Sequence, residues 1–139
     1  MLFDRKARMI ERVLIVEDEP LVAFDSEHFL IEQGYQVVAT VDSVAQALAV
    51  IAAEQIDLVL ADVSLSDDGD GVAVAQAAHA RGIATLFVTG ACPPDARQFA
   101  IGCLAKPYGH RQLRQVIDTV QAVMRGETPE QLPAGLSLY

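Results

Sequence analysis

The sequence is poor in several residue types, and each shortage excludes a class of protein. Tryptophan is absent, cysteine occurs twice, and 10 Lys and Arg stand against 19 Asp and Glu, which gives a formal net charge of -9 over 139 residues. Two cysteines without CxxC spacing or a nearby His cluster suggest neither a disulfide framework nor a zinc site, so we expect Cys92 and Cys103 to be ordinary buried or half-buried thiols. The acidic excess repels a phosphate backbone and argues against direct nucleic-acid binding.

Long apolar runs are missing as well. No stretch reaches the ~18 uninterrupted apolar residues that a membrane span needs. The basic residues of segment 1–12 are not followed by an apolar core that ends in a cleavage site. We therefore expect a cytoplasmic protein without membrane contact. Because 52% of the residues are apolar and 21% are charged, the chain is too apolar for a disordered protein, and its length fits one compact domain.

What the sequence does contain is an alternation of short apolar runs with longer helical stretches. Continuous apolar runs of strand length are typical of parallel strands buried on both faces. Expected strands are 13–16, 36–40, 58–61, 84–88 and 103–105. Expected helices are 20–33, a segment capped by Ser43, an Ala-rich segment that ends near Arg81, at most a short helix up to Ala100, and a last helix around 113–124. This alternation predicts an α/β fold with one parallel sheet covered on both faces.

The second helix and the two ends of the chain carry more specific expectations. Ser43 is expected to cap that helix with Gln46 as its partner three residues on, above a buried stripe of Val44, Ala47, Leu48 and Ile51. Residues 1–11 are expected to form an N-terminal extension, 12–126 the domain, and 127–139 an extended tail rich in turn-forming residues. The apolar end of that tail is compatible both with packing back on the domain and with binding a partner.

Polar residues follow the predicted strands at the points where the strands end. In open α/β sheets ligands bind outside the carboxyl ends of the strands. The segment 17–19 (Glu-Asp-Glu) follows the first strand, Asp62 the third, Thr89 the fourth and Lys106 the fifth. If the first and third strands are neighbours, Asp18 and Asp62 converge at one edge. Crowded carboxylates of this kind favour a bound hard cation, and Mg²⁺ fits best.

The remaining strand-end groups suit a phosphoryl group. A hydroxyl from Thr89 and an ammonium from Lys106 would supply contacts for phosphoryl oxygens. Asp62 would then be the nucleophile that forms an acyl phosphate, while the metal and Lys106 neutralise the charge that develops during transfer.

At these residues the sequence resembles the receiver domain of two-component response regulators. The resemblance covers about residues 12–125, and it lies in the order and spacing of four motifs. These motifs are Val13-Leu-Ile-Val-Glu17-Asp18-Glu-Pro20, Asp57-Leu-Val-Leu-Ala-Asp62-Val, Phe87-Val-Thr89-Gly90 and Lys106-Pro107-Tyr108. It implies a flavodoxin-like α/β fold, a five-stranded parallel sheet of strand order 2-1-3-4-5 with helices on both faces.

The resemblance also implies the roles of the site residues. Asp62 would accept a phosphoryl group from the phosphohistidine of a sensor histidine kinase or a histidine phosphotransfer protein. Mg²⁺, or Mn²⁺, would be bound by Glu17, Asp18, Asp62 and the backbone carbonyl of Ser64. Thr89 and Lys106 would contact the phosphoryl group. We expect self-catalysed transfer and slow autodephosphorylation rather than the turnover of a conventional enzyme.

The chain departs from the usual pattern of the family in two places. Cys103 stands where receivers commonly place an aromatic switch residue, and Lys106 follows Thr89 by only 17 positions. A short or irregular fourth helix is therefore expected, as in single-domain receivers with a Thr-Gly pair. Gly90, Ala91, Cys103 and Tyr108 are expected to modulate switching.

Two functions remain as alternatives. The first is a phosphorylation-dependent switch without an attached output domain, which would act by contact with a downstream protein or as a homodimer. The second is a constitutive, phosphate-independent binding module whose receiver site is partly vestigial. The apolar surface of the first helix is compatible with core packing and with docking of a kinase's phosphotransfer helix. Asp67, Asp68 and Asp70 are expected to add to the negative potential near the site.

Overall fold

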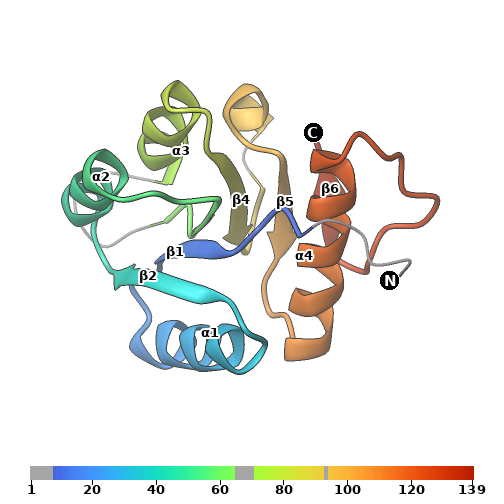
Figure 1. The fold of residues 1–139 in the computed structure, drawn as a ribbon, viewed down its shortest axis with the longest axis horizontal. Coiled ribbons are helices and arrows are strands. Elements are labelled where there is room, and N and C mark those ends of the chain that lie inside the picture. The colour runs from blue at the N-terminus through green and yellow to red at the C-terminus, as the bar shows by residue number, and fades with distance from the viewer. Residues whose placement is uncertain (1–7, 65–70, 93) are drawn as a thin grey trace.

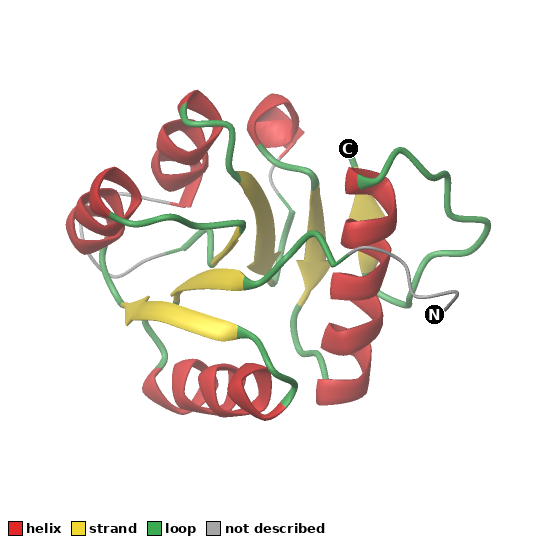
Figure 2. Ribbon diagram, viewed as in Figure 1, coloured by secondary structure: helices red, strands yellow, loops and turns green. Residues whose placement is uncertain are grey.

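The computed structural model describes residues 8–64, 71–92 and 94–139. These residues form one sheet with helices packed on both faces (Figures 1 and 2). The strands are β1 (Arg12–Val16), β2 (Gln36–Val41), β3 (Leu58–Ala61), β4 (Ala84–Thr89), β5 (Gly102–Ala105) and β6 (Leu136–Leu138). The helices are α1 (Pro20–Glu32), α2 (Val44–Ala53), α3 (Gly71–Ala80), the 3-10 helix η1 (Pro94–Phe99) and α4 (His110–Met124).

The order of the sheet is β2-β1-β3-β4-β5-β6. The first five strands pair in parallel, as the sequence predicts, and this confirms the flavodoxin-like order 2-1-3-4-5. The register pairs Val16 with Ala61 and Thr89 with Ala105. Because paired residues end their strands at the same level, the residues that follow β1, β3, β4 and β5 gather at one edge of the sheet.

Alternate residues of the strands face two separate apolar layers, which is the period-2 pattern of a sheet buried on both faces. The layer beneath α1 and α4 contains Val13, Ile15, Leu58, Leu60, Leu86, Val88 and Leu104. The layer beneath α2 and α3 contains Leu14, Val16, Val59, Ala61, Phe87 and Cys103. Helices on both faces (Figure 1) cover these layers.

The sheet has a sixth strand that the sequence did not predict. Residues 136–138, placed in the extended tail, form β6 and pair antiparallel with β5. The approach is close at Gly102, where a Cβ atom would lie 2.6 Å from the carbonyl oxygen of Ser137. Leu136 is buried in the layer beneath α4. The tail therefore packs back on the domain, which is one of the two alternatives left open by the sequence for this segment.

One residue of the buried stripe predicted for α2 is exposed in the structure. The Ser43 cap is confirmed, since the Gln46 N–H donates to Ser43 Oγ at 3.2 Å. Ala47 and Ile51 are buried, but Leu48 is 38% exposed and does not belong to the buried stripe. Leu48 lies one helical step, about 100°, beyond Ala47, so it sits at the margin of the face that meets the sheet.

The helix between β4 and β5 is short, as predicted, and is the 3-10 helix η1 of six residues. The first helix, α1, ends before Gly34, which has a φ of 92° that L side chains rarely adopt. On α1, Phe29 and Leu30 are buried in the core while Leu21 and Phe24 are 85% and 67% exposed. Part of the apolar surface of α1 therefore faces solvent.

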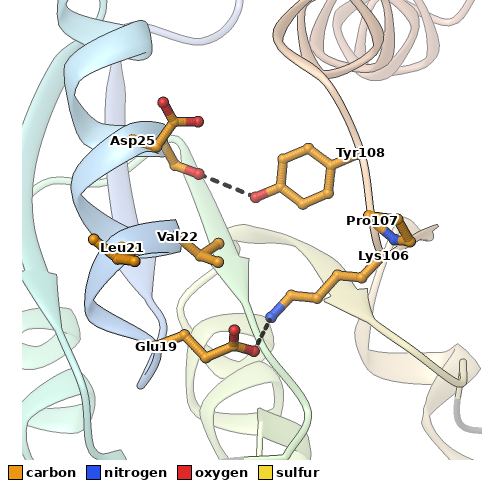
Figure 3. A pocket seen from close by; sticks show the side chains of 8 residues that line it. Glu19, Leu21, Val22, Asp25, Lys106, Pro107 and Tyr108 are labelled. Atoms are coloured by element: carbon orange, nitrogen blue, oxygen red, sulfur yellow. Dashed lines mark hydrogen bonds and ion pairs between the residues drawn. The ribbon is translucent and has the colours of Figure 1, made fainter.

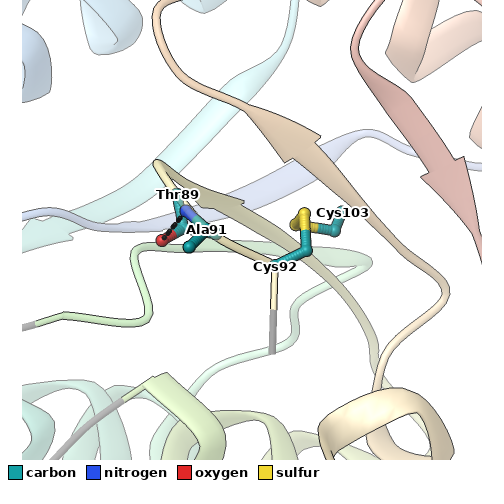
Figure 4. Close-up of a disulfide and its surroundings, with 4 residues drawn as sticks. All are labelled: Thr89, Ala91, Cys92 and Cys103. Carbon is teal, nitrogen blue, oxygen red and sulfur yellow. Dashed lines mark hydrogen bonds between the residues drawn. A yellow bond between two sulfur atoms is a disulfide. The ribbon is translucent and has the colours of Figure 1, made fainter. Parts of the chain in front are cut away.

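The expectation of two ordinary thiols is wrong, because Cys92 and Cys103 form a disulfide (Figure 4). Their Cα atoms lie 6.1 Å apart, within the range that a disulfide spans. The sequence separation of 11 carries no disulfide signature. The two residues meet because the chain that leaves β4 passes beside β5, which is a tertiary relation.

No helix in the described part of the chain combines the length and the apolar character that crossing a bilayer requires.

Candidate functional site

Three carboxylates meet where β1 and β3 end. Glu17 and Asp18 follow β1, Asp62 follows β3, and one carboxylate oxygen from each lies within 4.8 Å of the others. Glu17 and Asp62 are 4% and 5% exposed, so two of the three acidic side chains are buried. The Asp62 N–H donates to the carbonyl of Val16 at 2.9 Å and so extends the ladder beyond β3. The backbone of the sheet thus fixes the positions of these carboxylates.

Lys106, at the end of β5, brings a positive charge into this cluster. Its Nζ atom lies 2.6 Å from Glu17 Oε1, 3.0 Å from Asp62 Oδ2 and 3.4 Å from Glu19 Oε1. The Lys106 side chain is only 17% exposed. Glu17 Oε1 is buried without a well-aligned hydrogen bond to any described residue, so the 2.6 Å contact acts as an ion pair. The convergence of Asp18, Asp62 and Lys106, which the sequence predicted, is confirmed.

Burial and charge act against one another on these groups. Burial raises the pKa of Glu17 above its ordinary value, and the close contact with the Lys106 ammonium offsets this only in part. Burial alone would lower the pKa of Lys106, but the carboxylates of Glu17 and Asp62 outweigh it and raise that pKa. Lys106 is therefore held as a cation, and the charged form of Glu17 carries a desolvation cost that a second cation would relieve.

Thr89 ends β4 beside this cluster and is 4% exposed. Its carbonyl oxygen accepts a hydrogen bond from the Lys106 N–H at 2.9 Å, which joins the ends of β4 and β5. Its hydroxyl oxygen accepts from the Ala91 N–H at 3.4 Å. Gly90 and Ala91 are exposed in the loop that follows. The Thr89 hydroxyl is thus engaged with its own loop in this structure.

The loop after β3 contributes a backbone donor. The Ser64 N–H donates to Asp62 Oδ1 at 3.1 Å, and the part played by the Ser64 carbonyl stays a prediction. Asp67, Asp68 and Asp70 lie outside the described residues.

Gly71, the first residue of α3, is a site residue that sequence reasoning missed. Its N–H donates to the Val63 carbonyl at 2.9 Å. A Cβ atom on Gly71 would clash with the Asp62 carbonyl oxygen and would lie 2.9 Å from Val63 Cα. Only glycine therefore allows α3 to start so close to the backbone of Asp62. Sequence carries no signal for such a tertiary approach.

A cleft of about 630 Å³ opens between α1 and the chain that follows Lys106 (Figure 3). The hydroxyl groups of Tyr108 and Ser26 lie 3.0 Å apart and close one side of the cleft. Burial raises the pKa of Tyr108, against the lowering effect of that hydrogen bond. The residues that line the cleft include Glu19, Leu21 and Lys106. The apolar side of the cleft, with Leu21, therefore leads to the charged cluster around Lys106.

Comparison with known proteins agrees with this geometry. The sequence model for the response regulator receiver domain matches residues 13–118. The chain belongs to this family. It is therefore a receiver domain of two-component signalling systems, in agreement with the resemblance carried by the four motifs.

Individual relatives of this receiver domain are distant. The sensory transduction protein LytT of Enterococcus faecalis is 31% identical over 124 residues, which are 85% of this chain and 51% of LytT. The chain spans about half the length of such curated relatives. Among solved structures, a CheY-like receiver domain from Methanospirillum hungatei JF-1 superposes with a TM-score of 0.74 at 26% identity, covering 86% of this chain and 99% of the other.

A third similar protein is the receiver domain of the sensor histidine kinase PA1611 from Pseudomonas aeruginosa. Its TM-score is 0.68 at 23% identity, with 80% of this chain and 96% of that chain covered. At this identity the likeness shows the fold alone. That structure has a magnesium ion coordinated in its active-site cleft.

Proposed function

We propose that this receiver domain is a phosphorylation-dependent switch that accepts a phosphoryl group on Asp62. One observation carries the proposal: the Asp62 carboxylate is buried, shares a site with two further carboxylates, and lies 3.0 Å from the Lys106 ammonium. In a simple ion pair, one cation balances one carboxylate. Here a single cation contacts Glu17, Asp62 and Glu19, which leaves excess negative charge for a second cation.

The donor set fits a hard divalent cation such as Mg²⁺, since carboxylate oxygens are its preferred protein ligands. Glu17, Asp18 and Asp62 would hold the ion together with the Ser64 carbonyl, and Mn²⁺ would use the same ligands. The bound ion would neutralise charge on the phosphoryl oxygens during transfer. The magnesium in the PA1611 receiver supports this assignment.

Asp62, Lys106 and Thr89 then have different roles in the phosphoryl transfer. A carboxylate oxygen of Asp62 forms a bond to phosphorus as the bond between phosphorus and the donor imidazole breaks, and the product is an acyl phosphate. The Lys106 ammonium, already beside Asp62, pairs with the added negative charge. Thr89 donates its hydroxyl hydrogen to a phosphoryl oxygen, because the hydrogen bond from the Ala91 N–H uses only a lone pair of the hydroxyl oxygen. Hydrolysis of the acyl phosphate resets the switch.

The surface of α1 supports a docking mode for the phosphoryl donor. Leu21 is 85% exposed and lines the cleft that ends at Lys106, and Phe24 on the same helix is 67% exposed. We propose that a sensor histidine kinase or a phosphotransfer protein places a helix on this surface, with its histidine towards Asp62. Output then follows by protein contact, either with a downstream protein or within a homodimer, from a receiver unit of residues 12–126 with its tail.

A titration with beryllofluoride and Mg²⁺, followed by backbone NMR, tests the proposal. Beryllofluoride mimics a phosphoryl group on a carboxylate, so we expect shifts at Asp62, Thr89 and Lys106. Asp62→Asn should abolish them, and Phe24→Ala, on the exposed face of α1, should leave them unchanged. Wild-type spectra that do not respond would favour the alternative, a constitutive binding module with a vestigial site.

A further inference from the structure

The two cysteines of the chain meet beside the candidate site (Figure 4). Cys103 lies within β5 and is fully buried, whereas its partner Cys92 is exposed in the segment that follows β4. The sequence contains only these two cysteines. No other thiol of the chain competes for either sulfur, so the pair has two states, a disulfide and a dithiol.

The disulfide restrains the segment that follows Thr89, the residue proposed to contact a phosphoryl group. The Thr89 hydroxyl accepts from the Ala91 N–H at 3.4 Å, and the next residue, Cys92, is covalently joined to β5. At its other end the segment is anchored by the hydrogen bond from the Lys106 N–H to the Thr89 carbonyl at 2.9 Å. The three-residue link from Thr89 to Cys92 is therefore fixed at both ends.

We propose that Cys92 and Cys103 are a reversible redox modification site that regulates phosphorylation, with the disulfide restraining Thr89 and the dithiol releasing it. This regulation rests on the proposed function of Asp62, whereas the restraint on the segment does not. The disulfide state disfavours the conformation in which the Thr89 hydroxyl reaches a phosphoryl oxygen. Reduction removes that cost, so the reduced receiver holds the phosphoryl group more tightly.

The chemistry requires a dithiol, either a small molecule or a dithiol protein. A thiolate of this reductant attacks the sulfur of exposed Cys92, the bond to the buried sulfur of Cys103 breaks, and Cys103 leaves as a thiolate that takes up a proton. The second thiol of the reductant then attacks its own mixed disulfide and releases Cys92. Two electrons and two protons pass to the cysteines, and the reductant becomes a disulfide. Exchange with another disulfide reverses the steps.

Thermodynamic linkage makes the proposal quantitative. If reduction raises the affinity for a phosphoryl mimic by some factor, the bound mimic must shift the dithiol–disulfide equilibrium towards the dithiol by the same factor. A disulfide that only stabilises the fold, without coupling to the site, gives a factor of one in both measurements.

The test measures beryllofluoride affinity, with Mg²⁺ present, for oxidised and reduced protein. Redox state is verified by alkylation and intact mass, and Cys92→Ser is the control that cannot form the disulfide. We expect roughly tenfold tighter binding by the reduced form, the same factor in the redox equilibrium, and reduced-like binding by Cys92→Ser without any response to the reductant. Equal affinities in the two verified states overturn the proposal, as does a disulfide that opens only in denaturant.

A second measurement separates this proposal from the proposed function. If beryllofluoride binds neither state, Asp62 is not a working acceptor and the regulation falls with it. Hydrogen exchange of the Ala91 amide then still reports the restraint. Reduction should speed that exchange, by up to roughly a hundredfold if the whole loop-closure effect is released, and should have no effect in Cys92→Ser. Unchanged exchange in wild-type protein on reduction overturns the restraint itself.

Discussion

Removal of the Lys106 charge should lower the stability of the protein, because the buried carboxylates of the site would lose their cation. Lys106→Met keeps most of the apolar side chain but leaves Glu17 and Asp62 as buried carboxylates without their cation. Their nearest ligand oxygens lie within 4.8 Å. At that separation, and at an effective dielectric constant of 20, two like charges repel by about 3 kcal/mol. Loss of one partner of a buried ion pair costs a similar amount.

We therefore expect metal-free Lys106→Met to lose about 3 kcal/mol of unfolding free energy, which corresponds to a melting temperature lower by about 10 °C. Urea titrations followed by circular dichroism in EDTA provide the measurement. Arg111→Met is the matched control, because it removes the same charge from an exposed position on α4. Exposed charges of this kind contribute at most about 1 kcal/mol.

Mg²⁺ should narrow the difference between Lys106→Met and wild type. Since the ammonium no longer occupies the site, the variant should bind the ion more tightly than wild type. An ion at about ten times its dissociation constant adds about 1.4 kcal/mol of stability. The reasoning is refuted if Lys106→Met and Arg111→Met lose the same amount in EDTA, or if Mg²⁺ stabilises wild type more than Lys106→Met.

Three further predictions concern pH, packing and the disulfide. Because the pKa of Glu17 is raised above 4.5, the folded protein binds the Glu17 proton more tightly than the unfolded chain does. In EDTA, the contribution of Glu17 to the free energy of unfolding should therefore be present below pH 4.5 and be lost as the pH rises through the raised pKa. Glu17→Gln should flatten this part of the plot of stability against pH. Gly71→Ala should weaken beryllofluoride binding by displacing the Asp62 backbone, as read by NMR titration, whereas Gly109→Ala, where a Cβ atom meets nothing within 4 Å, should bind normally. Reduction of the disulfide should lower the unfolding free energy by about 3 kcal/mol, measured by urea titration, and a protein whose stability is unaffected by reduction would contradict this; Cys92→Ser should show no change on reduction.

The positions of the site residues were predictable because two simple rules coincide. An apolar run of four residues predicts a buried parallel strand, and the residue after it lies at the ligand-binding edge. Asp62 follows the run 58–61 and Lys106 follows 103–105, so both could be placed from spacing alone. Their close contact, 3.0 Å in the structure, follows from the strand order 2-1-3-4-5, which the resemblance to receiver domains implied.

Other features depend on tertiary contacts that spacing does not encode. The disulfide requires the segment after β4 to pass beside Cys103, and β6 requires the tail to return to β5 where Gly102 leaves room for it. Gly71 matters because of its approach to Val63 and not because of a turn. Leu48 was predicted to be buried from helical periodicity but is exposed. The spacing of apolar residues predicts a helix face, but it does not show which residues at the margin of that face contact the sheet.

The first residues before β1 illustrate the same limit. Ile10 is fully buried in the layer beneath α4. The side-chain carbonyl of buried Gln121 accepts hydrogen bonds from the N–H groups of Met9 and Ile10, at 2.9 and 3.0 Å. Nothing in the local sequence distinguishes these two residues from the rest of the predicted extension. Their contacts tie the entry to β1 against α4, at the edge of the sheet opposite the site.

Intact-mass spectrometry after incubation with acetyl phosphate and Mg²⁺ tests the central claim most directly. Acetyl phosphate donates a phosphoryl group without a partner protein, so the measurement depends on this chain alone. The account predicts a gain of the mass of one phosphoryl group in wild type, mapped by peptide analysis to Asp62, and no gain in Asp62→Asn or in EDTA. Wild-type protein that stays unmodified, or a phosphoryl group found on another residue, would contradict it.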